Sequence, residues 1–375
     1  MRQRLFFSAK RVCREAMAAI DPPKRQSRGK RRYRLGLIVG VNASLVLAGL
    51  VLLELAFGNW SASYVLPKPA LANRNLSYVQ TLYEPASVVV HRRDQYGLRG
   101  VRQPMSAVEL VTIGDSLTAQ TFIGEGDTWQ DIASALTGVA IANAGIDGMA
   151  SESAREILED WIGNIPGLRA KYYLHYYGFN DAGMLQTVSP ANRRKRYSWS
   201  RRIRGRSAIW QGTQLLRERV FGPGDAFVSR RVIAAPDPPA PLVEVTIQRG
   251  EIRAYVEDKY KPNLREILDY HRRRGQIAIF ANQLPNPAIV VVKGMDAFVS
   301  RPETGRWAAA LAEIHKATET ICRENPDTCR FIDTAGKLSM EPADYYDAVH
   351  YTPRGARKVG EFFAQHLGFI RELKP

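Results

Sequence analysis

The feature that most constrains the fold is a regular alternation of short apolar segments and amphipathic helices from residue 108 onwards. Short runs of β-branched and aromatic residues are typical of buried strands, and apolar residues at three- and four-residue steps are typical of helices. Strands that alternate with helices form βαβ units, in which helices cover both faces of a parallel sheet. The sequence therefore predicts an α/β domain. The expected strands are residues 108–113, 139–142, 171–177, 276–280 and 330–333, and the expected helices are residues 128–136, 154–165, 255–274, 307–322 and 353–366.

Polar residues follow three of these strands directly, and a fourth polar group precedes the last helix. Residues 114–117 read Gly-Asp-Ser-Leu, Gly145 follows the second strand, and residues 178–181 read Gly-Phe-Asn-Asp. Asp347 and His350 lie just before the last helix. Open α/β sheets bind ligands at the carboxyl ends of their strands, so we expect these groups to meet there.

These four blocks, in this order, resemble the pattern of the SGNH (GDSL) hydrolases. Each block alone occurs by chance in many proteins, whereas four blocks in order at strand and helix ends are specific. The resemblance covers about residues 107–370. It implies a flavodoxin-like three-layer α/β/α fold with a central parallel sheet, and it implies hydrolysis or transfer of an acyl ester. Residues 94–99 also resemble a segment that precedes the first block in some membrane-anchored bacterial members.

The residue types support this chemistry directly. Ser116 sits at a strand-to-helix turn, where its hydroxyl is exposed to a substrate, but a serine needs a base to become a nucleophile. Of the six histidines, only His350 has a carboxylate three residues earlier, and that residue, Asp347, would hold the imidazole tautomer. The predicted catalytic residues are therefore Ser116, Asp347 and His350. The alternative for His350 is a surface histidine near a solvated carboxylate.

The resemblance also implies an oxyanion hole. It assigns the donors to the backbone N–H of Ser116, the backbone N–H of Gly145 and the side chain of Asn180. A glycine suits the second position because a side chain would obstruct the approach of the backbone, and asparagine offers a neutral NH₂ donor. The alternative for Asn180 is a plain turn.

An apolar run precedes this domain and predicts a membrane anchor. Residues 35–53 are 19 apolar or small residues, interrupted only by Asn42 and Ser44, and a helix of that length spans a bilayer core. Basic residues lie before the run, so we expect the N-terminus in the cytoplasm. The protein would then cross the inner (plasma) membrane once, with the remaining chain in the periplasm or outside the cell. The alternatives are a buried core helix and a cleaved signal peptide that uses the small residues 61–63.

The charge of the chain is concentrated near the N-terminus. The formal net charge is +16, from 53 basic and 37 acidic residues, and residues 1–60 contribute 12 basic and 3 acidic residues, a net of +9. The catalytic part is therefore only moderately basic, which argues against nucleic acid as a partner.

These observations divide the chain into four parts. We expect a basic cytoplasmic tail over 1–34, an anchor helix over 35–57, a linker or accessory segment over 58–106, and the hydrolase domain over 107–375. An insert at about 182–250 is longer than the βα units require. Its basic run, residues 193–206, would either lie over the active site and engage an anionic glycan or phospholipid headgroups, or be a solvated surface loop.

The three cysteines exclude a disulfide scaffold. Cys13 would be cytoplasmic. Cys322 and Cys329 flank a turn-forming segment in the exported part, where an oxidising compartment would allow them to pair. The alternative is two free thiols.

An anchored hydrolase outside the membrane suggests a target in the cell envelope. Our first hypothesis is an O-acyl esterase that deacetylates envelope or secreted polysaccharide. The alternatives are an O-acyltransferase that acts on glycans, a lysophospholipase or thioesterase, and a catalytically silent binding module in an envelope assembly. The sequence shows no metal-ligand cluster, phosphate-binding loop or dinucleotide fingerprint, so no metal and no cofactor is expected.

Overall fold

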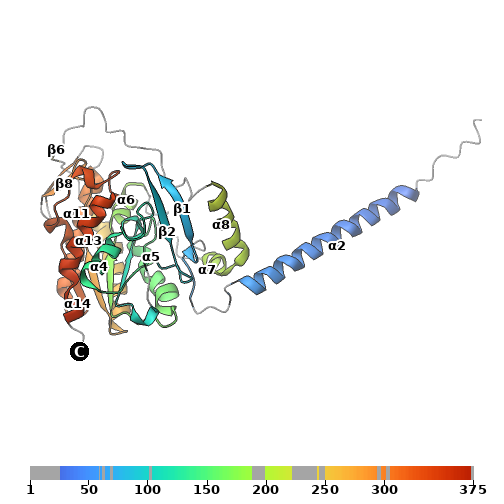
Figure 1. Ribbon diagram of the computed structural model, residues 1–375, viewed down its shortest axis with the longest axis horizontal. Coiled ribbons are helices and arrows are strands. Elements are labelled where there is room, and N and C mark those ends of the chain that lie inside the picture. The colour runs from blue at the N-terminus through green and yellow to red at the C-terminus, as the bar shows by residue number, and fades with distance from the viewer. Residues whose placement is uncertain are drawn as a thin grey trace, which may run out of the picture. The chain divides into compact units, whose positions relative to one another are not determined.

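The computed structural model describes residues 26–58, 60, 64–67, 71–100, 104–187, 199–221, 243–244, 250–293, 297–300 and 305–372. Its contacts divide the chain into two units, residues 1–58 and 59–375 (Figure 1). Cys13, the small residues 61–63 and the basic residues 193–198, which the sequence analysis singled out, lie outside the described residues.

The described part of the first unit, residues 26–58, is formed by one long helix, α2 (Gln26–Phe57). Its part Arg32–Phe57 has 26 residues and is long and apolar enough to cross a membrane, and none of it is buried. The predicted apolar helix is therefore present. Membrane anchors and N-terminal signal sequences share this length and composition.

The second unit is built on a parallel sheet of five strands in the order β10-β7-β5-β3-β4. The first of these strands in the chain, β3, lies between β4 and β5, so the direction in which the sheet grows reverses at β3. This order is the one of flavodoxin-like folds, and the reversal marks where such sheets bind ligands. It confirms the predicted α/β class. The strands are β3 (Leu110–Gly114), β4 (Ile141–Asn143), β5 (Tyr172–Tyr176), β7 (Ile277–Ala281) and β10 (Cys329–Ile332).

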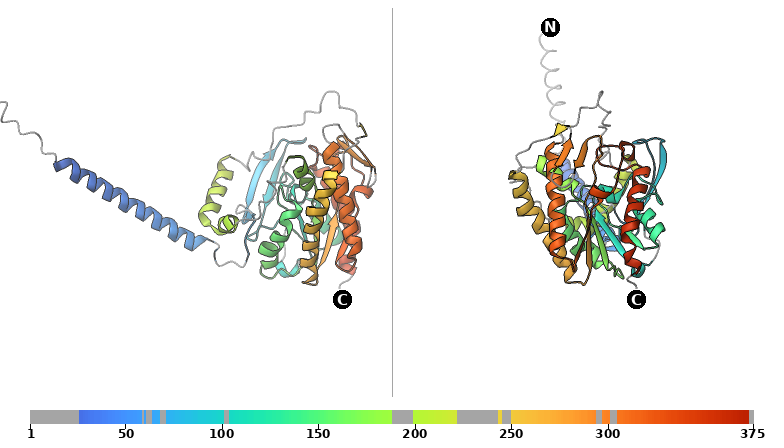
Figure 2. Two further views of the ribbon diagram at one scale, coloured as in Figure 1. Left: turned by 180° about the vertical axis from the view of Figure 1, so that it is seen from behind. Right: turned by 90° about the vertical axis from the view of Figure 1, so that its left-hand side faces the viewer.

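Helices cover both faces of this sheet, as the right-hand view of Figure 2 shows. On one face α4 packs against α13, and on the other α10 packs against α5 and α11. The start of α4 is set by Thr128, whose side chain accepts a hydrogen bond from the Asp131 N–H, and its end by Gly138 with φ +70°. The helices are α4 (Trp129–Thr137), α5 (Ser151–Glu156), α10 (Lys261–Arg272), α11 (Gly305–Glu324) and α13 (Pro353–Leu367).

Two of the predicted helices are less regular than expected. The predicted helix 154–165 starts as α5 and continues through a π-helical turn, Ile157–Trp161. The predicted helix 255–274 is preceded by α9 (Gly250–Tyr255) and contains a second π-helical turn, Val256–Tyr260.

The segment before the predicted domain folds with it. Strands β1 (Asn75–Gln80) and β2 (Ser87–Arg92) form an antiparallel hairpin, which the sequence analysis did not predict. The chain that follows is buried, since Leu98 and Arg99 are each 1% exposed. Arg99 also forms a backbone bridge with Asn143 at the end of β4. Residues 71–100 are therefore an integral part of the second unit.

Within the predicted insert the structure describes the helices α7 and α8 and the short strand β6, which pairs with β9 outside the insert. In α8 the side chains of Trp210, Leu216 and Val220 are exposed. The remaining elements are α3 (Ser116–Ala119), α6 (Phe179–Thr187), α7 (Trp199–Arg206), α8 (Ala208–Phe221), α12 (Thr334–Lys337), α14 (Phe369–Glu372), and the antiparallel sheet β6-β9-β8 of Val243–Glu244, Ala297–Ser300 and Val290–Lys293.

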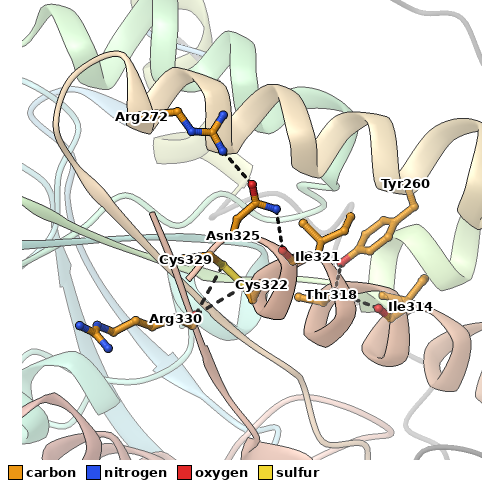
Figure 3. The surroundings of a disulfide bond; sticks show 9 residues. All are labelled: Tyr260, Arg272, Ile314, Thr318, Ile321, Cys322, Asn325, Cys329 and Arg330. Carbon is orange, nitrogen blue, oxygen red and sulfur yellow. Dashed lines mark hydrogen bonds between the residues drawn. A yellow bond between two sulfur atoms is a disulfide. The ribbon is translucent and has the colours of Figure 1, made fainter. Parts of the chain in front are cut away.

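A disulfide joins Cys322, near the end of α11, to Cys329, the first residue of β10 (Figure 3). The turn between them is tied down further by Asn325, whose Nδ2 donates to the Ile321 carbonyl at 2.8 Å. The Oδ1 of Asn325 accepts a hydrogen bond from Arg272 on α10 at 2.7 Å. The disulfide thus closes a helix-to-strand turn that also contacts the neighbouring helix.

Candidate active site

Ser116 is held at the reversal point of the sheet by the turn from β3 into α3. Asp115 caps the short helix, because its Oδ1 accepts the Leu117 N–H at 3.0 Å. The preceding residue must be glycine: a Cβ on Gly114 would lie 2.2 Å from the Tyr176 carbonyl oxygen on the neighbouring strand. The Gly-Asp-Ser sequence therefore makes the close approach to β5 and the helix cap that place the serine at the sheet edge.

His350 reaches Ser116 from the loop before α13. Its Nε2 lies 2.7 Å from Ser116 Oγ, and its Nδ1 lies 2.6 Å from Asp347 Oδ2. Asp347 is itself fixed, because its Oδ1 accepts the backbone N–H groups of Val349 at 2.8 Å and His350 at 2.7 Å. The structure thus brings together a hydroxyl, an imidazole and a carboxylate. Ser116 and His350, the two most distant of these residues, are 234 residues apart in the sequence.

The electrostatics of this chain of hydrogen bonds favour the charged imidazole. Burial lowers the pKa of His350, but the hydrogen bond and charge of Asp347 outweigh burial, so the pKa is raised above its ordinary value. Burial likewise raises the pKa of Asp347, but the His350 hydrogen bond and two backbone N–H groups outweigh it and hold this pKa below its ordinary value. Asp347 is therefore ionised wherever His350 titrates.

The two further oxyanion donors implied by the resemblance lie next to the serine turn. A Cβ on Gly145 would lie 2.3 Å from the backbone nitrogen of Ala119, so only glycine fits against the end of α3. The Gly145 N–H donates to Asn143 Oδ1 at 2.8 Å. Asn180 Nδ2 donates to the Met149 carbonyl at 2.9 Å and lies 3.4 Å from Asp115 Oδ2. Both donors thus have acceptors within the protein in this structure.

Comparison with known proteins identifies the family of the chain that carries this arrangement. The family model of the GDSL-like lipase/acylhydrolase family matches residues 112–358. The chain belongs to this family. Membership of this family identifies the protein as an ester hydrolase. It also confirms the resemblance that the four sequence blocks indicated. A search of curated proteins finds no match.

Several solved structures are similar to this GDSL hydrolase at low identity. A GDSL-family lipolytic protein from Desulfitobacterium hafniense DCB-2 is 11% identical, with a TM-score of 0.40, and the match covers 69% of this chain and 98% of that one. An extracellular lipase from Streptomyces rimosus is 13% identical, with a TM-score of 0.40 and coverage of 70% and 100%. Phospholipase A1 from Streptomyces albidoflavus NA297 is 12% identical, with a TM-score of 0.39 and coverage of 70% and 99%.

Sequence reasoning missed two arginines that support the site of this hydrolase from outside the family match. Arg93 is 6% exposed, and its Nη2 donates to the Gly145 carbonyl at 2.8 Å. Arg99 donates to the carbonyls of Gln120 at 2.8 Å and Ile123 at 2.5 Å, just after α3. Most of their acceptors are backbone oxygens, although Arg99 Nε also forms an ion pair with Glu125 Oε1 at 2.8 Å. These contacts between distant segments have no local signal in the sequence. The segment 71–100 therefore braces both loops that flank the serine.

Gln283 is a third missed residue. It follows β7 and is fully buried, and its Nε2 donates to Asp115 Oδ1 at 2.9 Å while its Oε1 accepts the Phe179 N–H at 2.9 Å. Burial raises the pKa of Asp115 to about 7, against the lowering effect of the Gln283 and Leu117 hydrogen bonds. Gln283 therefore links the serine turn to the asparagine turn. Its position directly after a predicted strand was the signal that would have found it.

The remaining histidines serve other roles. His175 and His271 form a buried pair, with their Nε2 atoms 2.9 Å apart. His91 and His315 are also buried, and burial lowers the pKa of each. Among the residues that the structure describes, no group of three or more His, Cys, Asp or Glu side chains is arranged to hold a metal ion.

Proposed function

We propose that this GDSL hydrolase is a serine esterase that removes O-acyl groups, above all acetyl, from a cell-envelope or secreted polysaccharide. Ser116 is the nucleophile, His350 the general base and Asp347 the residue that orients and stabilises the imidazole. The observation that supports these roles is the continuous hydrogen-bond chain from Ser116 Oγ through His350 to Asp347, at 2.7 and 2.6 Å. The pKa directions of His350 and Asp347 fit the same assignment, because they favour an imidazolium beside a carboxylate.

The proposed reaction has two balanced halves. Ser116 Oγ attacks the ester carbonyl while its proton moves to His350 Nε2, and collapse of the tetrahedral intermediate breaks the bond to the sugar oxygen, which takes that proton as the alcohol leaves. Water then gives a proton to His350 Nε2 and attacks the acyl-serine. As the second tetrahedral intermediate collapses, His350 returns the proton to Ser116 Oγ and the carboxylic acid leaves. Asp347 stays ionised throughout. These steps need no metal and no cofactor.

We assign the oxyanion hole to the N–H groups of Ser116 and Gly145 and to Asn180 Nδ2. For this role the Gly145 N–H exchanges or shares its bond to Asn143, and Asn180 exchanges its bond to Met149 for the oxyanion. Loss of one such donor typically costs about 3–4 kcal/mol of transition-state stabilisation. The Arg93 contact to the Gly145 carbonyl supports this assignment, because it fixes the peptide that follows the donor.

We further propose that α2 anchors the enzyme in the inner membrane, with the basic N-terminus in the cytoplasm and the catalytic unit in the periplasm or outside the cell. The positive residues before the apolar run support this orientation. Alkaline phosphatase fused after residue 65 is then active in a bacterial host. An inactive fusion would reverse the topology.

The test of the catalytic assignment is a pair of measurements on the full-length protein. A fluorophosphonate probe labels the wild type and not Ser116→Ala, and Ser116→Ala loses hydrolysis of p-nitrophenyl acetate while its melting temperature is kept. A wild type that is not labelled and does not turn over esters would favour a silent binding module. A series of acyl esters from C2 to C16 separates the others: preference for C2 supports deacetylation, preference for long chains supports a lysophospholipase or thioesterase, and transfer to an added sugar supports an O-acyltransferase.

A further inference from the structure

Four aromatic side chains from three distant segments meet beside His350. We call them the aromatic wall: Tyr78 from β1, Tyr83 from the turn after β1, Phe122 from the loop after α3, and Tyr346. The Tyr346 ring lies parallel to the His350 imidazole, with an interplanar angle of 7° and centroids 5.4 Å apart. Tyr83 and Phe122 contact Tyr346 at 5.9 and 6.3 Å, and Tyr78 contacts Phe122 at 6.0 Å.

The wall is fixed by its own hydroxyl groups. Tyr83 Oη donates to the Phe122 carbonyl at 2.8 Å, and Tyr78 Oη donates to the Thr121 carbonyl. These bonds attach the β1–β2 hairpin to the loop after the nucleophile. Because the two hydroxyls are occupied, the rings offer their faces and edges for further contacts rather than their polar ends.

The wall differs from the aromatic core of the same domain. In the core, Trp129 packs on Phe363 at 4.7 Å and both side chains are 0% exposed. All four rings of the wall are instead half-buried. Tyr78 and Tyr83 also precede residue 112, where the family match begins, so the hairpin adds these rings to the shared family domain.

The place of the wall relative to the reaction indicates what it contacts. In the proposed mechanism His350 Nε2 protonates the leaving alcohol, so the alcohol part of the ester lies on the His350 side of Ser116. The wall packs directly on His350 through Tyr346. It therefore lines the side of the scissile bond on which the alcohol leaves, whereas Gly145 and Asn180 contact the carbonyl oxygen.

A carboxylate lies at the same place. Asp147 Oδ2 accepts a hydrogen bond from Thr121 Oγ1 at 3.1 Å, and its negative charge acts on His350, Tyr346 and Tyr78. Its side chain is half-buried. The π face of an aromatic ring is electronegative and attracts weakly positive C–H groups, and a carboxylate accepts hydrogen bonds from hydroxyls. A sugar ring presents both groups, C–H bonds on its faces and hydroxyls at its rim.

We propose that the aromatic wall and Asp147 form a subsite for the sugar ring that carries the ester. This inference rests on the proposed esterase function, because it uses the leaving-alcohol side of Ser116. The β1–β2 hairpin is then the element that makes this GDSL hydrolase select a carbohydrate ester over a simple one.

The decisive variant is Tyr83→Ala, since Tyr83 contacts Tyr346 but does not touch His350 in the ring stack. Full-length wild type and variant are compared on a mono-O-acetylated disaccharide and on ethyl acetate, which carries the same acetyl group without a ring. The ratio of kcat/KM for the sugar ester to that for ethyl acetate falls about tenfold in the variant, mainly through KM, which is the size of one aromatic contact. Val88→Ala, at a residue of β2 that is 65% exposed, is the matched hairpin control and keeps the ratio.

Other results would overturn the subsite. An equal loss on both substrates would make the wall only a support for His350, and no loss on either would remove its role. A loss confined to long-chain ethyl esters would assign the wall to the acyl chain.

A binding measurement separates failure of the subsite from failure of the catalytic assignment. Calorimetric titration of Ser116→Ala with cellobiose, maltose, mannobiose and N,N′-diacetylchitobiose shows binding of at least one, and adding Tyr83→Ala or Asp147→Asn weakens it. Absence of binding to every disaccharide would refute the sugar subsite even if the enzyme hydrolyses esters. Binding that Tyr83→Ala weakens, without ester turnover by the wild type, would keep the carbohydrate site and refute the esterase.

Discussion

The imidazole of His350 and the two imidazoles of the His175–His271 pair lie in opposite surroundings. His350 lies at the edge of the sheet beside the Asp347 carboxylate, and its pKa is raised. His175 is on β5 and His271 on α10, both buried, and burial lowers the pKa of both, that of His271 to about 4. A neighbouring carboxylate therefore prepares one imidazole to carry a proton, whereas burial without one keeps the other two neutral.

The hydrogen bonds of the buried pair define its tautomers. His271 Nδ1 contacts the Gln276 Oε1 acceptor at 3.0 Å, so Nδ1 carries the proton and Nε2 of His271 is an acceptor. His175 Nε2 must then donate across the 2.9 Å contact. His175 Nδ1, which is buried without a hydrogen-bond partner, is consequently an unprotonated nitrogen and not an orphaned donor. The pair is a structural hydrogen bond, and protonation of its acceptor, His271 Nε2, would break it.

The largest expected difference between the two environments is in catalysis. His350→Ala removes the base, and kcat/KM for p-nitrophenyl acetate falls by a factor of about 10⁵ or more, with little change in the melting temperature. His366→Ala is the matched control, because His366 lies on α13 with its Nδ1 against the Phe362 carbonyl. A His350→Ala enzyme within tenfold of the wild type would contradict the comparison.

Asp347→Asn tests the cause of the raised pKa. The variant keeps the size of the side chain but loses the charge and the correct imidazole tautomer, so kcat falls by a factor of about 10⁴. In the wild type, His350 must be neutral to act as a base, so the acid limb of the kcat/KM profile has its midpoint above 6.5. Without the carboxylate, burial is the largest remaining influence and the midpoint moves down. A midpoint that stays in place would assign the acid limb to another group.

The buried pair is expected to affect stability instead of chemistry. His271→Leu leaves the His175 N–H without its acceptor, which costs about 1–3 kcal/mol in the free energy of unfolding by chemical denaturation. The double variant His175→Phe/His271→Leu removes both partners and recovers part of that loss. Turnover by the folded protein stays within about threefold of the wild type in each case. Loss of turnover that matches His350→Ala would mean that the pair takes part in catalysis.

The contact of His350 with Asp347 was predictable from the sequence, whereas the buried pair was not. Asp347 and His350 are three residues apart, so the sequence contains their contact, and the block order supplies Ser116. His175 and His271 meet only because β5 and α10 pack together, and they are 96 residues apart in the sequence. Contacts made between distant elements have no local signal.

The same distinction explains the hairpin. The central strands were predictable because each is a continuous apolar run, as expected for a sheet buried on both faces. In β1 and β2, Val79 and Val88 are exposed while Tyr78 packs against Phe122, so the apolar pattern did not indicate which side packs. Arg93 and Arg99 are buried against backbone carbonyls, which any sequence provides. Sequence reasoning captured the residues of the candidate site, and it missed the structure that supports them.

The last expected difference is in stability in mild acid. Since the folded pKa values of His175 and His271 are lowered, the unfolded chain binds protons first as the pH falls below 6.5. The stability that the pair contributes is then lost progressively, for His271 down to about pH 4. Asp115 and Asp181 act oppositely, because burial raises their pKa values to about 7 and about 6, so their contribution is lost as the pH rises. The wild type and His175→Phe/His271→Leu both contain these carboxylates, so the contribution of the carboxylates cancels in the difference between the two unfolding free energies. That difference shifts in favour of the double variant between pH 6.5 and 4, and a difference that does not vary with pH would show that the buried imidazoles are not kept neutral by the fold.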